Sequence, residues 1–151
     1  MKKTLTVAVL GLTTLLASGS VLAQAKPDIL VKQRQAAMTL QGKYFGPMGG
    51  MAAGKVPYNA DVVKRNAALL EALSKMAWDG FTPGTQEIKS RGLPAIYSDA
   101  AKFKEFQDSF QAEATKLVAT ANGGDEAAIK AQISAIGKTC GGCHDGFREK
   151  Q

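Results

Sequence analysis

The most restrictive feature of this sequence is the pentapeptide Cys-Gly-Gly-Cys-His at residues 140–144, which contains both cysteines and the only histidine of the chain. Two thiols three residues apart, followed directly by an imidazole, match the attachment pattern of a c-type haem. In such a site the thiols add to two vinyl groups and the histidine binds the iron from the proximal side. The motif therefore predicts one covalent haem c per chain, held by Cys140 and Cys143, with His144 as the metal ligand.

Two other uses of a Cys-x-x-Cys pair fit the sequence less well. A redox disulfide of this spacing belongs to a strand-to-helix unit, and nothing before Cys140 has the periodicity of a strand. A structural zinc ion usually takes four ligands, and the chain has only two cysteines and one histidine to offer. Haem attachment is favoured, and a disulfide or a chance occurrence of the motif are the alternatives.

The first 23 residues have the three regions of a secretory signal peptide. Residues 1–3 are Met-Lys-Lys, an apolar run interrupted by Thr and Gly spans residues 5–17, and residues 21–23 end in a small residue. The mature chain is expected to start at Gln24, with cleavage after Ala25 as the alternative. The apolar run is shorter than the about 20 residues of a membrane span, so we expect no membrane association after signal removal.

Removing residues 1–23 from the 151-residue chain leaves 128 residues, the length of one domain, residues 24–151. Lys2 and Lys3 leave with the signal, so 17 Lys and Arg remain against 13 Asp and Glu, a net charge of +4. This small excess forms no basic cluster and gives no indication of nucleic-acid binding. The signal and the haem motif together predict a location in the bacterial periplasm.

Hydrophobic periodicity predicts four amphipathic helices and no strand. The first starts at Pro27, whose fixed φ suits the first helical turn, and ends near residues 47–50. The second is capped by Asn59 and ends around Trp78. Its apolar residues at helical spacing are expected to face the core: Val62, Leu69, Leu73 and Met76.

The third helix is expected to be capped by Ser98 and to end at residues 122–124, and Asp125 caps a fourth helix that carries the haem motif. Residues 79–97 have no sustained periodicity and form the longest connection, expected to cover the haem or to cross between distant helix ends. Four helices joined by three connections predict an all-α fold, an antiparallel four-helix bundle with covalently bound haem.

The mature chain resembles the cytochromes c prime, or class II c-type cytochromes. Beyond the haem motif, the resemblance rests on Arg148 and on the segments Lys-Gln-Arg-Gln at 32–35, Trp-Asp-Gly-Phe at 78–81 and Leu-Pro-Ala-Ile-Tyr at 93–97. The family usually carries Trp where this chain has Tyr97, a difference that we expect to affect packing alone. The resemblance implies a four-helix bundle with the haem motif at its C-terminal end.

The resemblance also implies haem contacts outside the motif. Arg34 and Gln35 become haem-edge residues, with Arg34 as the partner of a propionate, since a guanidinium can pair with a carboxylate through two parallel hydrogen bonds. A solvated Arg34 is the alternative. Arg91 in the long connection and Arg148 after the motif are further implied contacts.

A single histidine excludes coordination of the iron by two histidines, so the sixth position falls to methionine, water, another ligand or none. The resemblance places Met38 over the distal face, where typical members leave the iron five-coordinate and some relatives use a methionine of the first helix as sixth ligand. With Phe81 beside it, Met38 would give a pocket without a hydrogen-bond donor, which favours nitric oxide or carbon monoxide. No distal acid/base is evident, so we do not expect an enzyme.

Two functions follow from these observations. The first is a high-spin, five-coordinate haem used for electron transport, for binding of nitric oxide and carbon monoxide, or for both. The second is a low-spin electron carrier with Met38 as sixth ligand. The resemblance further implies a weak symmetric homodimer formed through the first two helices, and the sequence carries no motif that identifies a periplasmic redox partner.

Intact-mass spectrometry tests the haem prediction on protein purified from a bacterial host that matures c-type cytochromes. We expect the mass of one haem added to a chain that starts at Gln24, or at Lys26 if cleavage follows Ala25. Thioether bonds resist acid acetone. A chain without haem, or haem that acid acetone extracts, would contradict the prediction.

Overall fold

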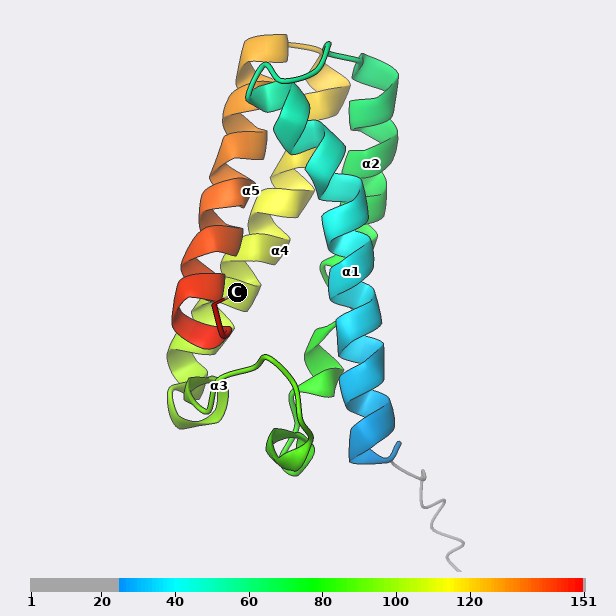
Figure 1. The fold of residues 1–151 in the computed structure, drawn as a ribbon. Helices are drawn as coiled ribbons and strands as arrows, with labels where there is room; N and C mark the ends of the chain where they lie inside the picture. The colour runs from blue at the N-terminus through cyan, green and yellow to red at the C-terminus, as the bar shows by residue number, and fades with distance from the viewer. Residues whose placement is uncertain (1–24, 151) are drawn as a thin grey trace, which may run out of the picture.

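The computed structural model describes residues 25–150, in which four long helices form an antiparallel bundle (Figure 1). The expected signal peptide, residues 1–23, lies outside the described residues. The long helices are α1 (Pro27–Ala52), α2 (Ala60–Leu73), α4 (Ala100–Gly123) and α5 (Glu126–Phe147). Between α2 and α4 lie η1 (Trp78–Gly80), η2 (Thr85–Glu87) and α3 (Ala95–Ser98). Within residues 25–150 there is no β-strand, and no helix is long and apolar enough to cross a membrane.

The first helix continues past the expected end at residues 47–50, because its last turns carry core residues. Pro47 lies inside α1 and has no N–H to donate to the backbone oxygen of Lys43. Met48 and Met51 follow it and are buried in the bundle core, 0% and 7% exposed. Burial of these two side chains compensates for the lost backbone hydrogen bond, and the helix ends at Ala52.

The second helix differs from the prediction in both its buried face and its end. Leu69 and Met76 are 37% and 58% exposed, and of the expected stripe only Leu73 is buried. The face that packs against α1 and α4 is shifted by one residue from the predicted stripe. It includes Asn66, whose side-chain amide donates to the backbone oxygen of Tyr44 at 3.0 Å. The residues of this face are Val63, Asn66, Ala67, Leu70 and Leu73.

Helix α2 ends at Leu73 rather than near Trp78, because a side chain takes the place of a backbone donor. In a continuing helix the backbone oxygen of Ser74 would accept from the backbone N–H of Trp78. It accepts instead from the indole Nε1 of Trp78 at 2.5 Å and from the amide of Gln111 at 3.3 Å. The last backbone bonds tighten to i→i+3 geometry, and the chain leaves the helix.

The starts of the four long helices agree with the sequence in three of four cases. Asn59 accepts from the N–H of Val62 at 2.9 Å, and Asp125 accepts from two N–H groups at the start of α5. Pro27 starts α1 as expected. The cap of α4 is Asp99 rather than Ser98, which is the last residue of α3.

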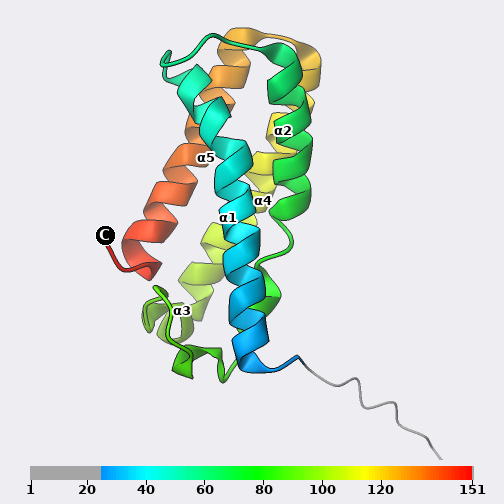
Figure 2. The ribbon, with the colours of Figure 1, turned by 45° about the vertical axis from the view of Figure 1, so that its right-hand side comes forward.

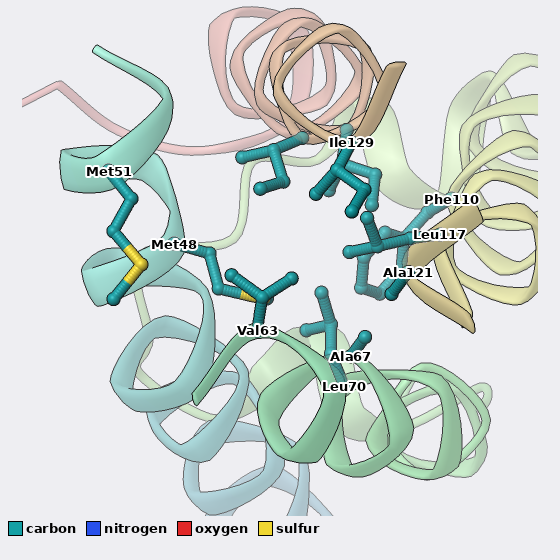
Figure 3. Close-up of a cluster of buried hydrophobic side chains, with 11 residues drawn as sticks. Met48, Met51, Val63, Ala67, Leu70, Phe110, Leu117, Ala121 and Ile129 are labelled. Atoms are coloured by element: carbon teal, nitrogen blue, oxygen red, sulfur yellow. The ribbon is translucent and has the colours of Figure 1, made fainter. Parts of the chain in front are cut away.

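Two clusters of buried side chains fill the bundle. The larger joins all four long helices, as Figure 3 shows, with Met48, Val63, Leu117 and Ile129 among the members with 0% or 1% exposure. The smaller comprises Ile96, Phe103 and Phe147, which lie at the end of the bundle where α5 terminates. The haem motif therefore lies between a closely packed bundle and a separate aromatic cluster.

The connection between α2 and α4 is held at two places. At its start, Gly80 packs so closely on α1 that a Cβ there would lie 2.5 Å from the Cβ of Arg34 and 2.8 Å from the backbone oxygen of Leu30. At its far end, Gly92 forms an isolated antiparallel β-bridge with Arg148, directly after α5. Figure 2 shows this connection below the bundle, between the start of α1 and the end of α5.

Replacing Gly80 with Ala should destabilise the protein by about 1–3 kcal/mol, because the added methyl group overlaps backbone and Cβ atoms that cannot move away. Chemical denaturation of the haem-loaded protein measures the change in the free energy of unfolding. The matched control is Gly46→Ala in α1, where no atom lies within 4 Å of the added Cβ. The control should stabilise by about 0.5–1 kcal/mol, since Ala is the better helix former, and equal effects of the two variants would contradict this reading.

Candidate functional site

The predicted haem-binding motif lies in the last two turns of α5. Cys140, Cys143 and His144 are half-buried, and both cysteines are free thiols rather than a disulfide. Gly142 between them permits close packing, because a Cβ at this position would lie 3.0 Å from the ring of Phe106 in α4. The two thiols and the imidazole therefore stand on a helix face that is close to α4 on one side and open to a cavity on the other.

Two adjoining cavities meet at this face, one of about 370 Å³ and one of about 250 Å³. Both are lined by Met38 of α1, by Cys143 and His144 of α5 and by Arg148 beyond its end. The larger lies in the volume range of ligand pockets, about 300–1,000 Å³, and the smaller extends it. All nine residues expected at the site line one cavity or the other: Arg34, Gln35, Met38, Phe81, Arg91, Cys140, Cys143, His144 and Arg148.

Aromatic rings form much of the wall, and of these only Phe81 is among the residues that the sequence analysis expects at the site. Phe103 makes edge-to-face contacts with Phe81 at 4.9 Å and with Phe147 at 5.2 Å between ring centroids. Phe106 lies 6.0 Å from Phe147, and Trp78 lies 5.9 Å from Phe103. The Phe-rich end of α4 was the available sequence signal. Ser90 and Gly92 also line the larger cavity, and no sequence pattern indicated them.

Arg34 is not solvated, which excludes the surface alternative. It is 4% exposed, and its guanidinium lies 4.4 Å from the ring centroid of Phe81. Its Nη1 donates to the backbone oxygen of Gly80 at 2.7 Å, and its Nη2 donates to Ser90 Oγ at 2.9 Å. No carboxylate among the described residues lies within ion-pair distance of it. The positive charge is therefore buried against neutral oxygens of residues 80–97.

One donor nitrogen of Arg34, Nε, has no acceptor among the described residues. A guanidinium has five N–H groups, and its hydrogen bonds to the described residues use only Nη1 and Nη2. Nε therefore has no acceptor among these residues, although no fully enclosed side-chain nitrogen of the described residues lacks a partner. Nε and Nη2 form the edge of a guanidinium that pairs side-on with a carboxylate.

Tyr97 contributes more than packing, contrary to the expectation from its sequence position. Its hydroxyl lies 2.7 Å from Thr85 Oγ1 and 3.3 Å from Nη1 of Arg34. A tryptophan has a single N–H donor and no acceptor. The Tyr in this chain therefore provides an acceptor for Arg34 that the usual family residue would not provide.

Arg91 and Arg148 line the cavity from the two segments of the chain that the β-bridge joins. The N–H of Glu149 donates to the backbone oxygen of Arg91 at 2.9 Å, and the N–H of Leu93 donates to that of Phe147 at 3.0 Å. The Arg91 side chain donates to the backbone oxygen of Glu149 at 2.6 Å. The long connection is thus fastened to the end of α5, directly beyond His144, and the larger cavity has three guanidiniums and no carboxylate among its described lining residues.

The thiols are protonated at neutral pH. Burial raises the pKa of Cys143 to about 11, with a smaller upward effect from charge on Cys140 and an opposing effect from Arg148. Burial also raises the pKa of Cys140. Redox-active Cys-x-x-Cys pairs have a thiol pKa below the usual value, so these two thiols do not have the properties of a redox disulfide site.

The imidazole of His144 is biased toward its neutral form. Burial lowers its pKa, and the positive charges of Arg148 and Arg91 lower it further, against the opposite effect of Asp145. Neutral imidazole is the form that binds metal ions. Two free thiols and a neutral imidazole on one cavity wall, facing apolar rings and guanidiniums that can receive carboxylates, together suit a haem c with two propionates.

Comparison with known proteins gives matches along nearly all of the described residues. A sequence model described as Cytochrome C' matches residues 29–148. The chain is 44% identical over 126 residues to the cytochrome c' of Rubrivivax gelatinosus, and the match covers 83% of this chain and 98% of that protein.

Solved structures give the same result. The nitric oxide complex of a mutant cytochrome c prime from Alcaligenes xylosoxidans superposes with a TM-score of 0.76 at 41% identity, covering 84% of this chain and 98% of that one. A carbon monoxide-bound variant of the same protein superposes with a TM-score of 0.75 at 41% identity, covering 83% and 98%.

Proposed function

Since this chain belongs to the cytochrome c prime family and is therefore a covalent haem c protein, we propose that it is a periplasmic cytochrome with a five-coordinate, high-spin haem. Its function is electron transfer, binding of nitric oxide and carbon monoxide, or both. The observation that carries the proposal is the composition of the two cavities at residues 140–144. Among their described lining residues, His144 is the only imidazole and Met38 is the only methionine.

The motif residues have separate roles in this proposal. Cys140 and Cys143 form the two thioether bonds, and His144 binds the iron on the proximal side, with the neutral imidazole that its burial favours. A haem held there would supply an iron that can exchange one electron and bind a diatomic gas. The positions of the two thiols and the imidazole on successive turns of one helix support this division of roles.

Met38 covers the opposite side of the site as a packing residue. Of the methionines in the described part of the chain, Met48 and Met51 are in the bundle core and Met76 is 58% exposed, so Met38 alone is near His144 in the cavity walls. Met38 and Phe81 present no N–H or O–H group to a bound gas. A gas bound against these two side chains would receive no hydrogen bond from them, which disfavours oxygen and leaves nitric oxide and carbon monoxide as the preferred ligands.

Arg34 is the proposed partner of one propionate. Its unpaired Nε, together with Nη2, provides the side-on edge, and the guanidinium has no other anion among the described residues. Gln35, Arg91 and Arg148 line the same cavity and contribute the remaining polar contacts at the haem edge.

Electron transfer or gas binding, rather than catalysis, is the role that the cavity chemistry supports. Heterolytic cleavage of an O–O bond requires an acid/base group beside the iron. The described lining of the two cavities offers no carboxylate, and its only imidazole is His144, the proposed iron ligand.

The absorption spectrum in both redox states tests the coordination of the iron. With Met38 as a packing residue, the ferrous protein should show a broad high-spin visible band that changes on addition of carbon monoxide or nitric oxide. Met38→Leu should preserve this spectrum and lower stability by less than about 1.5 kcal/mol, because the two side chains have similar volumes. Met48→Leu in the bundle core is the matched control, and it should likewise leave the spectrum unchanged.

The alternative function gives a different spectrum. If the sulfur of Met38 binds the iron, the ferrous bands should be sharp, the ferric protein should show a weak far-red band, and gases should bind slowly. Met38→Leu would then change the spin state. Sharp ferrous bands that Met38→Leu abolishes would replace the gas-binding proposal with that of a low-spin electron carrier.

We propose a weak symmetric homodimer formed through α1 and α2. In the described part of the chain, all large exposed apolar side chains lie on these helices or directly after them: Ile29, Leu40, Val56, Leu69 and Met76. Exposed apolar side chains concentrated on one part of a monomer are typical of an interaction surface. A symmetric pair would bury the same surface of both subunits.

Sedimentation equilibrium at micromolar concentration tests the dimer. Leu69→Lys should weaken dimerisation at least about tenfold, or about 1.4 kcal/mol, because it places a charge in the interface. Ala119→Lys on the exposed surface of α4 is the control and should leave the dissociation constant unchanged. Observation of monomer alone for the unmodified protein would exclude the dimer.

A further inference from the structure

Tyr97 and Thr85 form a hydrogen-bonded chain that ends on Arg34. Thr85 is fully buried, and its Oγ1 lies 2.7 Å from the hydroxyl of Tyr97 and 3.3 Å from Nη1 of Arg34. The same Nη1 lies 3.3 Å from the Tyr97 hydroxyl. These residues come from η2, α3 and α1, which are far apart in sequence. The group therefore exists only in the folded protein.

The direction of each hydrogen bond follows from counting protons. Thr85 has one hydroxyl proton, and it donates this proton to the backbone oxygen of Thr82 at 2.7 Å. Tyr97 must then donate its own proton to Thr85 Oγ1. The phenolic oxygen of Tyr97 and Thr85 Oγ1 are left to accept from Nη1 of Arg34, and because Nη1 has two N–H groups for these two oxygens and that of Gly80, one N–H is shared. Each hydroxyl in such a series polarises the next, which strengthens the chain.

This arrangement determines how the guanidinium is oriented. Nη1 is held by Gly80, Thr85 and Tyr97, and Nη2 is held by Ser90. A planar guanidinium that is hydrogen-bonded at both terminal nitrogens cannot turn about the Cδ–Nε bond without losing these bonds. Nε, which has no acceptor among the described residues, is thereby kept in one direction.

We propose that Tyr97 and Thr85 are positioning residues of the haem site, which hold Arg34 so that its Nε–Nη2 edge faces a propionate. The proposal rests on the propionate contact of Arg34 in the proposed function. Phe81 strengthens the arrangement, because its ring lies 4.4 Å below the guanidinium and also forms part of the cavity wall. Loss of the Tyr97 hydroxyl should turn the guanidinium without removing its charge.

Both contacts of residue 97 in this chain of hydrogen bonds require a hydroxyl group. Phenylalanine would keep the ring but neither donate to Thr85 nor accept from Arg34. Tryptophan would offer one N–H donor and no acceptor, so it would place a donor opposite the donors of Arg34. Of the three aromatic residues, only Tyr completes the chain.

The experiment measures the reduction potential of the haem-loaded protein in Arg34→Gln, Tyr97→Phe and the double variant. Arg34→Gln should lower the potential, because a positive charge near the haem favours the reduced iron. Tyr97→Phe should lower it in the same direction by part of that shift. In the Arg34→Gln background, Tyr97→Phe should have no further effect, because Tyr97 acts through Arg34.

The control and the second variant separate this role from a general loss of structure. Tyr58→Phe removes a hydroxyl in the connection between α1 and α2, beside Lys130 near the start of α5, and should leave the potential unchanged. Tyr97→Trp should shift the potential as Tyr97→Phe does, and it serves in its place if Tyr97→Phe does not retain haem. Thr85→Val removes the second hydroxyl at nearly constant volume and should act in the same direction.

Two outcomes would overturn the proposal while leaving the propionate contact intact. One is a shift for Arg34→Gln with no shift for Tyr97→Phe. The other is a pair of shifts that simply add in the double variant, which would indicate that Tyr97 acts on the haem independently of Arg34. An unchanged potential for Arg34→Gln would instead overturn the propionate contact itself, and the positioning role with it.

Discussion

Burial of the Arg34 guanidinium is the interaction on which the haem end of this bundle depends. A charge removed from water is costly unless its hydrogen bonds are replaced, and here the replacements all come from residues 80–97 of the connection. The segment therefore has a defined position against α1 although it has little regular structure. Gly80 makes this approach possible, since any larger residue would overlap Arg34 and the backbone of Leu30.

The other end of the same connection is joined to the end of α5, so one segment spans the site between the first and last helices. The β-bridge of Gly92 with Arg148 begins four residues after His144. Hydrogen bonds thus join the connection, which carries Phe81 and Arg91, to the end of α5, which carries His144 and Arg148. A change at the polar end of the connection can therefore reach the haem edge through backbone contacts as well as through charge.

The two buried clusters differ in composition, and this difference explains why the bundle can hold a large cavity. Met48, Val63, Leu117 and Ile129 fill the space between the four helices at one end, where packing requires no ligand. At the other end, edge-to-face aromatic pairs provide rigid walls with few rotatable bonds. Met38, half-buried on both cavities, is the adaptable side chain between the two regions, as suits an unbranched thioether.

The sequence by itself determined the helical bundle, the family and the covalent haem, because helical periodicity, caps such as Asn59 and Asp125, and the spacing of two thiols and an imidazole are local properties of the chain. The other expected site residues followed from the resemblance to the family, and all nine line the two cavities. Only the tertiary structure decided which face of α2 is buried, since Asn66 and Ala67 are placed there by close helix packing and by a carbonyl of α1 rather than by hydrophobicity. Only the tertiary structure likewise decided that Arg34 is held by Tyr97, Thr85 and Ser90, because contacts between residues more than fifty positions apart leave no periodic trace in the sequence.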